Sequence, residues 1–248
     1  ATDIPLERYH GAVLDKTTNK GMAIDVQGLN FQSSIFTEKS LNSVSFSVQP
    51  NERVCIVADT SLTVNSLFYL LTGICEKQSG MITLDNLPLE NLNTHELRSQ
   101  IGTVLASDQL IDVSLEDNIR FGNHSVELSE IATIMELLGM TNFVNQCNEK
   151  YATQLSNEIH FIPKDSITKL LYARAILKNP RLLLLDDPTG GMSQNQKQPL
   201  LAHLEQLSNT TLLMASNDQS IQKMADRIVK FEQGTLVFDG NYESFSKL

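Results

Sequence analysis

Glycine is scarce in this chain and is unevenly distributed along it. Only 12 of the 248 residues are glycine, which is below the roughly 7% of an average protein. No glycine lies between Gly28 and Gly73, and none lies between Gly139 and Gly190. A backbone that turns sharply, or that brings its N–H groups against an anion, generally needs glycine. These two gaps therefore exclude glycine-rich anion-binding loops from two long segments.

Basic clusters, cysteine patterns and long apolar runs are also missing. The chain has 19 Lys and Arg against 29 Asp and Glu, a formal net charge of −10. Without grouped cations we expect no nucleic-acid partner. No apolar run reaches the roughly 18 residues of a membrane helix, and the N-terminus has no signal-peptide pattern. Three cysteines and five histidines match no metal-ligand spacing, so we expect free thiols in a reducing compartment.

The order of the predicted elements indicates a layered α/β domain. Apolar segments at residues 53–57, 182–185 and 211–215 predict buried strands, and they alternate with segments of helical periodicity. Such alternation favours a mainly parallel sheet. The early and late strand pairs predict added antiparallel elements, and the mostly helical stretch from about 115 to 148 predicts an inserted subdomain.

The chain divides into two predicted parts. Residues 1–21 are polar with little periodicity, which predicts a linker or arm. Residues 22–248 predict one large domain, in which about residues 107–170 form the helical subdomain. Within this domain a helix is predicted over residues 65–72, directly after the first buried strand.

Five segments carry a family resemblance. They are residues 115–122 (LEDNIRFG), 151–153 (YAT), 173–175 (ARA), 178–189 (KNPRLLLLDDPT) and 225–240 (ADRIVKFEQGTLVFDG). In this order and at this spacing, the chain resembles the nucleotide-binding domain of ABC transporters, and most closely the exporter type. The resemblance implies an α/β fold of the P-loop NTPase kind, with a parallel-sheet core, antiparallel β elements and an inserted helical subdomain.

The segment that aligns with the family's P-loop runs from Ala58 to Ser66 (ADTSLTVNS). A P-loop needs glycines whose backbone N–H groups surround the phosphates, a Lys, and a Ser or Thr hydroxyl that reaches Mg²⁺. The aligned residues are Ala58, Ser61 and Thr63 for the three glycines, Val64 for the Lys and Asn65 for the Mg²⁺-binding Ser. Only Ser66 matches, as a candidate for cofactor binding, and Asp59 adds a negative charge where a polyphosphate would sit.

The other nucleotide-contacting segments of the family are altered as well. The signature, which in this family grips the γ-phosphate bound to the opposite domain, aligns with residues 162–166 (IPKDS). The Q-loop Gln aligns with Ala106 and the H-loop His with Asn217. The D-loop aligns with residues 190–193 (GGMS), where the family does not need glycine. Both halves of a shared site are therefore altered, so we expect that a normal partner completes neither site.

Two carboxylates remain after the strand predicted at residues 182–185. Asp186 stands at the Walker B position, so the resemblance makes it a Mg²⁺ ligand when nucleotide is present. Asp187 stands at the position of the catalytic Glu and is one methylene shorter, which reduces its reach to an attacking water. We interpret both as an inherited cap of the strand, with an isolated metal role as the alternative.

This pattern of losses predicts a degenerate nucleotide-binding domain. Phosphoryl transfer is mostly positioning and charge neutralisation, so we expect no ATP hydrolysis and no bound cofactor. The resemblance implies a structural or regulatory role in an exporter-like protein at the cytoplasmic face of the membrane. The expected partners are a transmembrane domain, in another chain or upstream of Ala1, and a second nucleotide-binding domain.

Two alternatives stay open. In the first, the chain is an ATP-binding subunit of an ABC transporter whose divergent loops are still usable, and its cofactor is Mg-ATP. In the second, it is a soluble scaffold that binds another protein through the old dimer face. The sequence fixes neither a transported substrate nor the oligomeric state, although loss of ATP favours a monomer in isolation.

Overall fold

The computed structural model describes residues 8–35, 37–156 and 159–248, in which the strands form two sheets. The strands are β1 (Ile24–Phe31), β2 (Leu41–Val48), β3 (Arg53–Ala58), β4 (Ser79–Leu84), β5 (Leu87–Pro88), β6 (Ile101–Val104), β7 (Leu182–Asp186), β8 (Thr211–Ala215), β9 (Arg227–Glu232) and β10 (Thr235–Gly240). The smaller sheet is antiparallel, in the order β2-β1-β4-β5. The larger sheet has the order β10-β9-β3-β8-β7-β6, and only the β10–β9 pair is antiparallel. The predicted parallel core with antiparallel additions is confirmed.

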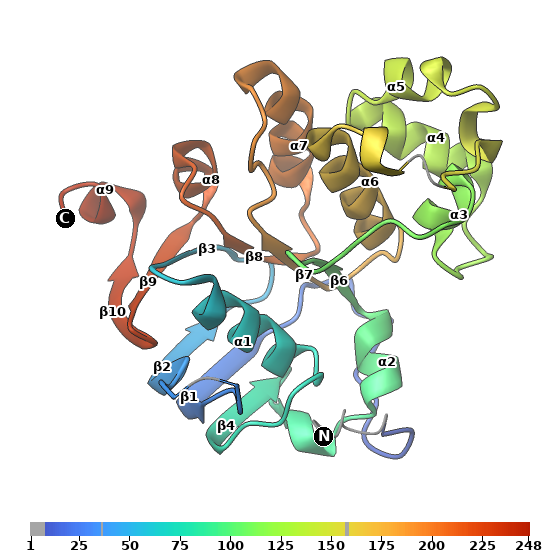
Figure 1. Ribbon diagram of the computed structural model, residues 1–248. Coiled ribbons are helices and arrows are strands. Elements are labelled where there is room, and N and C mark those ends of the chain that lie inside the picture. Colours follow the sequence, from blue (N-terminus) through green and yellow to red (C-terminus); the bar gives the residue numbers. More distant parts are fainter. Residues whose placement is uncertain (1–7, 36, 157–158) are drawn as a thin grey trace.

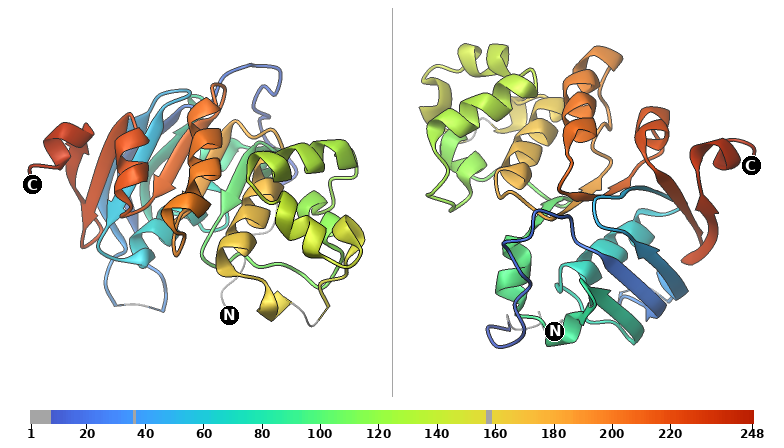
Figure 2. Two further views of the ribbon diagram at one scale, coloured as in Figure 1. Left: turned by 90° about the horizontal axis from the view of Figure 1, so that it is seen from above. Right: turned by 180° about the vertical axis from the view of Figure 1, so that it is seen from behind.

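Helices cover both faces of the larger sheet. The α-helices are α1 (Ser61–Leu71), α2 (Thr94–Ser99), α3 (Leu115–Arg120), α4 (Leu128–Leu137), α5 (Thr141–Gln146), α6 (Lys164–Ile176), α7 (Gln194–Gln206), α8 (Gln219–Met224) and α9 (Tyr242–Phe245). Short 3-10 turns lie at Leu89–Asn91, Lys150–Ala152 and Ile159–Phe161. Figure 1 shows α6, α7 and α8 on one side of the six-stranded sheet and α1 with the small sheet on the other. Two further views in Figure 2 show the same layers.

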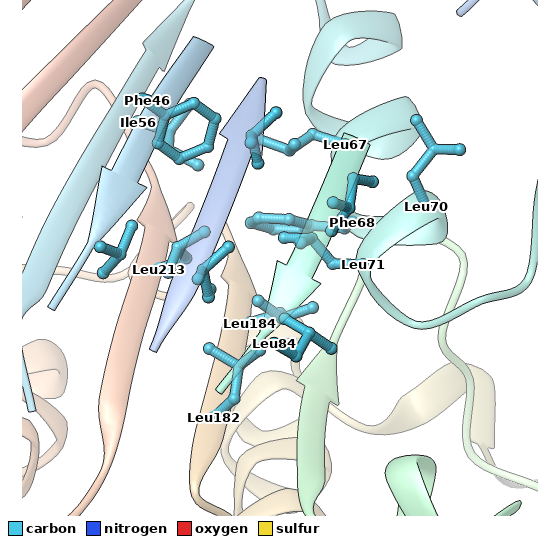
Figure 3. Close-up of a cluster of buried hydrophobic side chains, with 14 of the residues drawn as sticks. Phe46, Ile56, Leu67, Phe68, Leu70, Leu71, Leu84, Leu182, Leu184 and Leu213 are labelled. Carbon is cyan, nitrogen blue, oxygen red and sulfur yellow. The ribbon is translucent and has the colours of Figure 1, made fainter. Parts of the chain in front are cut away.

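The strand β7 explains why the core has two halves. Leu182 and Leu184 belong to the apolar cluster that contains α1 and the small sheet, whereas Leu183 and Leu185 belong to the cluster under α6 and α7. A strand that is buried on both faces is expected to be apolar at every position. Figure 3 shows the first cluster, in which Phe68 and its neighbours on α1 face Leu84, Leu182 and Leu184.

The inserted helical region begins after β6 and consists of α3, α4 and α5. The predicted boundary at residue 170 falls inside α6, which continues to Ile176. Helix α6 also buries Leu170 and Tyr172 in the second cluster, together with residues of β7 and α7. The helix therefore joins the inserted region to the sheet, and the exact domain boundaries stay a prediction.

The part of the N-terminal arm that the structure describes lies against the core. Leu14 and Met22 are buried, and the guanidinium of Arg181 donates to the carbonyl oxygens of Lys20 and Gly21 at 2.9 and 3.3 Å. Arg181 also forms an ion pair with Asp85 at 2.7 Å. Residues 1–7 of the predicted arm lie outside the described residues. In the described part of the chain no helix is long and apolar enough to cross a membrane.

Candidate functional site

A cavity of about 330 Å³ lies at the carboxyl ends of the parallel strands β3, β7 and β8. Its lining residues are Ile56, Ala58, Asp59, Thr60, Ser61, Val64, Asp186, Asp187, Ala215, Ser216, Asn217 and Asp218. Ligands of α/β proteins generally bind at this edge of the sheet, where the loops after the strands meet. The structure therefore brings together the predicted P-loop segment, the two Walker B carboxylates and the H-loop position.

The loop between β3 and α1 is short and closed by its own hydrogen bonds. Helix α1 begins at Ser61, four residues before the predicted start, because Thr60 caps it. The Oγ1 atom of Thr60 accepts the backbone N–H of Thr63 at 3.4 Å. An N-cap hydroxyl of this kind satisfies one of the free N–H groups of the first turn. Of the residues that align with the phosphate loop, Ala58 ends β3 and residues 61–64 form the first turn of α1.

The same loop has the wrong backbone conformation for a phosphate cradle. Anion-binding nests alternate right-handed and left-handed residues, so that successive N–H groups converge on one point. Between Asn51 and Gly73, a segment that the structure describes completely, no residue has a positive φ. The glycine gap noted in the sequence therefore corresponds to a regular strand–helix connection without a nest.

The side chains of the aligned segment also differ in position and chemistry from those that bind phosphate in a P-loop. Val64 is 5% exposed and contributes an apolar surface to the cavity. Ser66 is buried on the other side of α1, and its hydroxyl donates to the Oγ atom of Ser40 at 2.8 Å. Asp59 lies at the cavity, and its carboxylate accepts the backbone N–H of Gln233 at 2.9 Å. The cofactor-binding role assigned to Ser66 stays a prediction.

Asp186 ends β7 and is half-buried at the cavity. Burial raises the pKa of its carboxyl group, the backbone N–H of Ala106 works in the opposite direction, and the charge of Asp187 raises it further. Ala106 is the residue at the Q-loop position, so the loop after β6 reaches the Walker B carboxylate through its backbone. The metal role assigned to Asp186 stays a prediction, and the described residues contain no group of three or more His, Cys, Asp or Glu that could hold a metal ion.

Asp187 has an unusual backbone that the sequence did not reveal. Its φ is +46°, in the left-handed region that non-glycine residues rarely adopt. Its N–H donates to the carbonyl oxygen of Ala215 at 2.8 Å, and its carboxylate lies over Gly190, where an added Cβ would overlap it. An alanine at position 190 would therefore force the exposed Asp187 carboxylate to move. The catalytic role that the family alignment assigns to Asp187 stays a prediction.

Asp218 is a further carboxylate of this cavity that sequence reasoning missed. Both of its oxygens accept from the Nζ atom of Lys197, at 2.8 and 3.1 Å, and the Thr189 hydroxyl donates to it at 3.0 Å. Burial acts to raise the pKa of Asp218, but hydrogen bonds from Lys197, Ser220 and Thr189 lower it to about 2. No sequence signal identified this pair, because the two residues are 21 positions apart and lie on different elements.

The cavity does not fit the triphosphate and Mg²⁺ of a nucleotide bound in the P-loop manner. Four carboxylates, Asp59, Asp186, Asp187 and Asp218, contribute to its lining, and no Lys or Arg is among the lining residues, all of which the structure describes. Lys197 compensates only Asp218. Anions at close range need positive charge or converging N–H groups. The lining has no Lys or Arg, and the loop before α1 has no left-handed residue of the kind that forms an anion-binding nest.

The signature position lies outside this cavity. Residues 162–166 approach and enter the start of α6, where Pro163 is the N-cap and makes no side-chain capping bond. Lys164 is exposed, and Asp165 accepts a hydrogen bond from the amide of Gln196 at 3.0 Å. The structure therefore separates this segment from the residues of the P-loop position within one chain.

A second hollow lies on the helical region. It has a volume of about 360 Å³ and is lined by Ile111, Val113, Asp117, Arg120, Phe121, Gly122 and His124. Phe121 is 49% exposed and has a left-handed φ of +44°. The guanidinium carbon of Arg174 lies 4.3 Å from the centre of its ring, a cation–π geometry. Sequence reasoning noted this segment only as part of the family resemblance.

Comparisons with known proteins agree on the fold. The ABC transporter family matches residues 41–190. The chain is 27% identical over 236 residues to an uncharacterized ABC transporter ATP-binding protein, YfiB, of Bacillus subtilis (strain 168), covering 95% of the chain and 40% of that protein. It is 28% identical over 244 residues to the ATP-dependent lipid A-core flippase of Legionella pneumophila (strain Lens), covering 97% and 41%.

A solved structure gives the same result for the architecture. The structure of a bacterial Atm1-family ABC exporter with ATP bound superimposes with a TM-score of 0.87 at 20% sequence identity, covering 97% of this chain and 42% of that one. The chain spans about two fifths of the length of the relatives it matches. The predicted α/β fold with antiparallel and helical additions is confirmed. The chain belongs to the ABC transporter family and corresponds to its nucleotide-binding domain.

Proposed function

We propose that this domain keeps the shape of an ABC nucleotide-binding domain but does not hydrolyse ATP and binds it poorly. The observation that carries the proposal is the loop between β3 and α1, in which Thr60 caps a helix that starts at Ser61. A P-loop works by converging N–H groups and a lysine, and this segment has neither. The carboxylates of Asp59, Asp186 and Asp187 at the same cavity repel a polyphosphate.

The role that fits such a domain is structural or regulatory, within an exporter-like protein. The relatives are described as an ABC transporter ATP-binding protein and as an ATP-dependent flippase, and the chain covers only a part of each. We infer that a transmembrane domain supplies the rest, in the same or another chain, and that this domain lies at the cytoplasmic face of the membrane. A second nucleotide-binding domain is a further candidate partner.

The hollow at Phe121 is the surface that suits the transmembrane partner. It presents Ile111 at 45% exposure and Phe121 at 49%, and a half-exposed aromatic beside an aliphatic side chain is typical of interface anchors. The guanidinium of Arg174 packs against the Phe121 ring and also donates a hydrogen bond to the carbonyl oxygen of Asn118 at 2.8 Å. The ring is therefore kept in one position, which lowers the entropy cost of docking.

A second candidate function is an ATP-binding subunit with divergent but usable loops. The family and the names of the relatives favour it, and so does the retention of Asp186 at the end of β7. It requires Mg-ATP to bind through contacts other than those of a P-loop. It differs from the first proposal in predicting saturable binding that depends on Asp186.

Phosphate release separates the two candidates. We expect the chain and its Asp186→Asn variant to release phosphate from Mg-ATP at the same background rate. Saturable Mg-ATP binding that disappears in Asp186→Asn, or turnover that falls to background in that variant, would favour the second candidate. An active nucleotide-binding domain, assayed in the same buffer, is the positive control.

A further inference from the structure

The first turn of α7 contacts two regions that lie far apart in the sequence. One is the wall of the cavity at the start of α8, and the other is the start of α6. Lys197 and Gln196 are neighbours on this turn, and each of them makes a long-range polar contact. Their contacts link the carboxyl edge of the parallel sheet with the helix that carries the inserted helical region.

The contact with the cavity wall is made by Lys197. Its ammonium group bonds both carboxylate oxygens of Asp218, and the side chains are only 12% and 21% exposed. The same carboxylate accepts the hydroxyl of Thr189 and the backbone N–H of Ser220 at 3.0 and 2.8 Å. Because charge-assisted bonds in a shielded position are stronger than exposed ion pairs, this carboxylate fixes the loop after β7 against α8.

The contact with α6 is made by Gln196. Its Oε1 atom accepts the backbone N–H of Ser193 at 2.8 Å, which completes a capping box at the start of α7. Its Nε2 atom donates to the carboxylate of Asp165 in the first turn of α6 at 3.0 Å. One amide therefore both caps α7 and attaches it to α6.

We propose that the first turn of α7 is a brace that holds the cavity wall and the start of α6 together, so that loosening one contact loosens the other. Lys197 is the positioning residue at one end, through Asp218, and Gln196 is the positioning residue at the other, through Asp165. The proposal rests on these contacts and not on the proposed function.

Amide hydrogen exchange of the full chain tests the brace. In Lys197→Met we expect exchange to rise about tenfold in residues 187–193, 216–222 and 164–168, because opening costs less free energy when a contact is removed. In Gln196→Ala we expect the rise mainly in residues 164–168 and at the start of α7. Lys247→Met, which removes an exposed lysine near the C-terminus, is the matched control and leaves all these segments unchanged.

The brace is overturned if Lys197→Met leaves residues 164–168 at the wild-type rate. It is also overturned if both variants raise exchange evenly along the whole chain, since that result means general destabilisation. Repeating the wild-type measurement with Mg-ATP separates this proposal from the proposed function. Protection by Mg-ATP would contradict the loss of nucleotide binding, while the Lys197→Met result would still decide whether the brace exists.

Discussion

The side chain of Asp187 occupies the space that a Cβ atom on Gly190 would fill. Asp187 has a left-handed backbone, and its side chain lies over the Cα atom of Gly190. Strained backbone of this kind often marks a functional position. In this chain it turns the carboxylate at the catalytic Glu position toward the D-loop segment, so the glycine that seemed superfluous in the sequence has a steric reason.

Gly190→Ala is expected to destabilise the protein by about 0.5–1.5 kcal/mol, because the new methyl group overlaps the carboxylate of Asp187 and forces that exposed side chain out of its position. Removing that carboxylate as well relieves the overlap. The double variant with Asp187→Ala should therefore cost less free energy of unfolding than the sum of the two single variants. Urea denaturation measures all three values, and additivity within about 0.5 kcal/mol would argue against the steric pair.

The pH dependence of stability has a residue-scale cause in Asp218. Its pKa is lowered from the ordinary value of 3.8 to about 2 in the folded protein. A lowered folded pKa means that the ionised group stabilises the fold above the unfolded pKa, and that this contribution is lost as the pH falls through about 2. Asp218→Asn removes the contribution.

Urea unfolding between pH 5 and pH 2 measures this effect. Over this range the wild-type free energy of unfolding should fall more steeply than that of Asp218→Asn, and Lys197→Met should behave like Asp218→Asn. Asp112→Asn is a suitable control because this exposed carboxylate lies in the loop before α3 and does not line the cavity. Equal slopes for the wild type and Asp218→Asn would contradict the assigned role of the Lys197 pair.

At the scale of elements, the proposed loss of ATP binding is tested at the start of α1. The helix begins at Ser61 because Thr60 caps it and no glycine interrupts it. Val64→Lys alone places an ammonium on a helix that still lacks the cradle of N–H groups. We therefore expect this single variant to bind Mg-ATP no more than a few times better than the wild type.

Restoring the whole loop should have a larger effect. The combined variant carries Ala58→Gly, Ser61→Gly, Thr63→Gly, Val64→Lys and Asn65→Ser. We expect it to bind Mg-ATP at least about tenfold more tightly than Val64→Lys alone, a difference of roughly 1.4 kcal/mol. Fluorescent-nucleotide titration compares the variants, and tight binding by Val64→Lys alone would show that the backbone already supplies the cradle.

Elements with a strong local pattern could be predicted from the sequence, and those that depend on distant contacts could not. The strand β7 was predicted because four consecutive leucines fit a strand buried on both faces. The start of α1 was predicted four residues too late, because the prediction did not include Thr60 as the N-cap that starts the helix at Ser61. The cavity residues at Asp186 and Asn217 followed from family spacing, whereas Lys197 and Asp218 form a pair only after folding.

At the scale of the whole molecule, the family architecture extends over nearly the whole chain. Two sheets, α1 between them and a helical region beside α6 reproduce the ABC layers with a TM-score of 0.87. The described part of the arm is attached to the core by Arg181, whose guanidinium donates hydrogen bonds to the carbonyl oxygens of residues 15, 20 and 21. Such contacts involve backbone atoms and leave no pattern in the sequence, so residues 1–21 were predicted as a linker or arm without contacts to the core.

The central claim is that the fold is retained without useful affinity for ATP. Its most direct test is a calorimetric titration of the chain with Mg-ATP, with an active nucleotide-binding domain as the positive control. The account predicts a Kd weaker than roughly 100 μM, which corresponds to less than about 5.5 kcal/mol of binding free energy. A saturable heat signal with a tighter Kd would contradict it and would assign the chain to the ATP-binding subunits of its family.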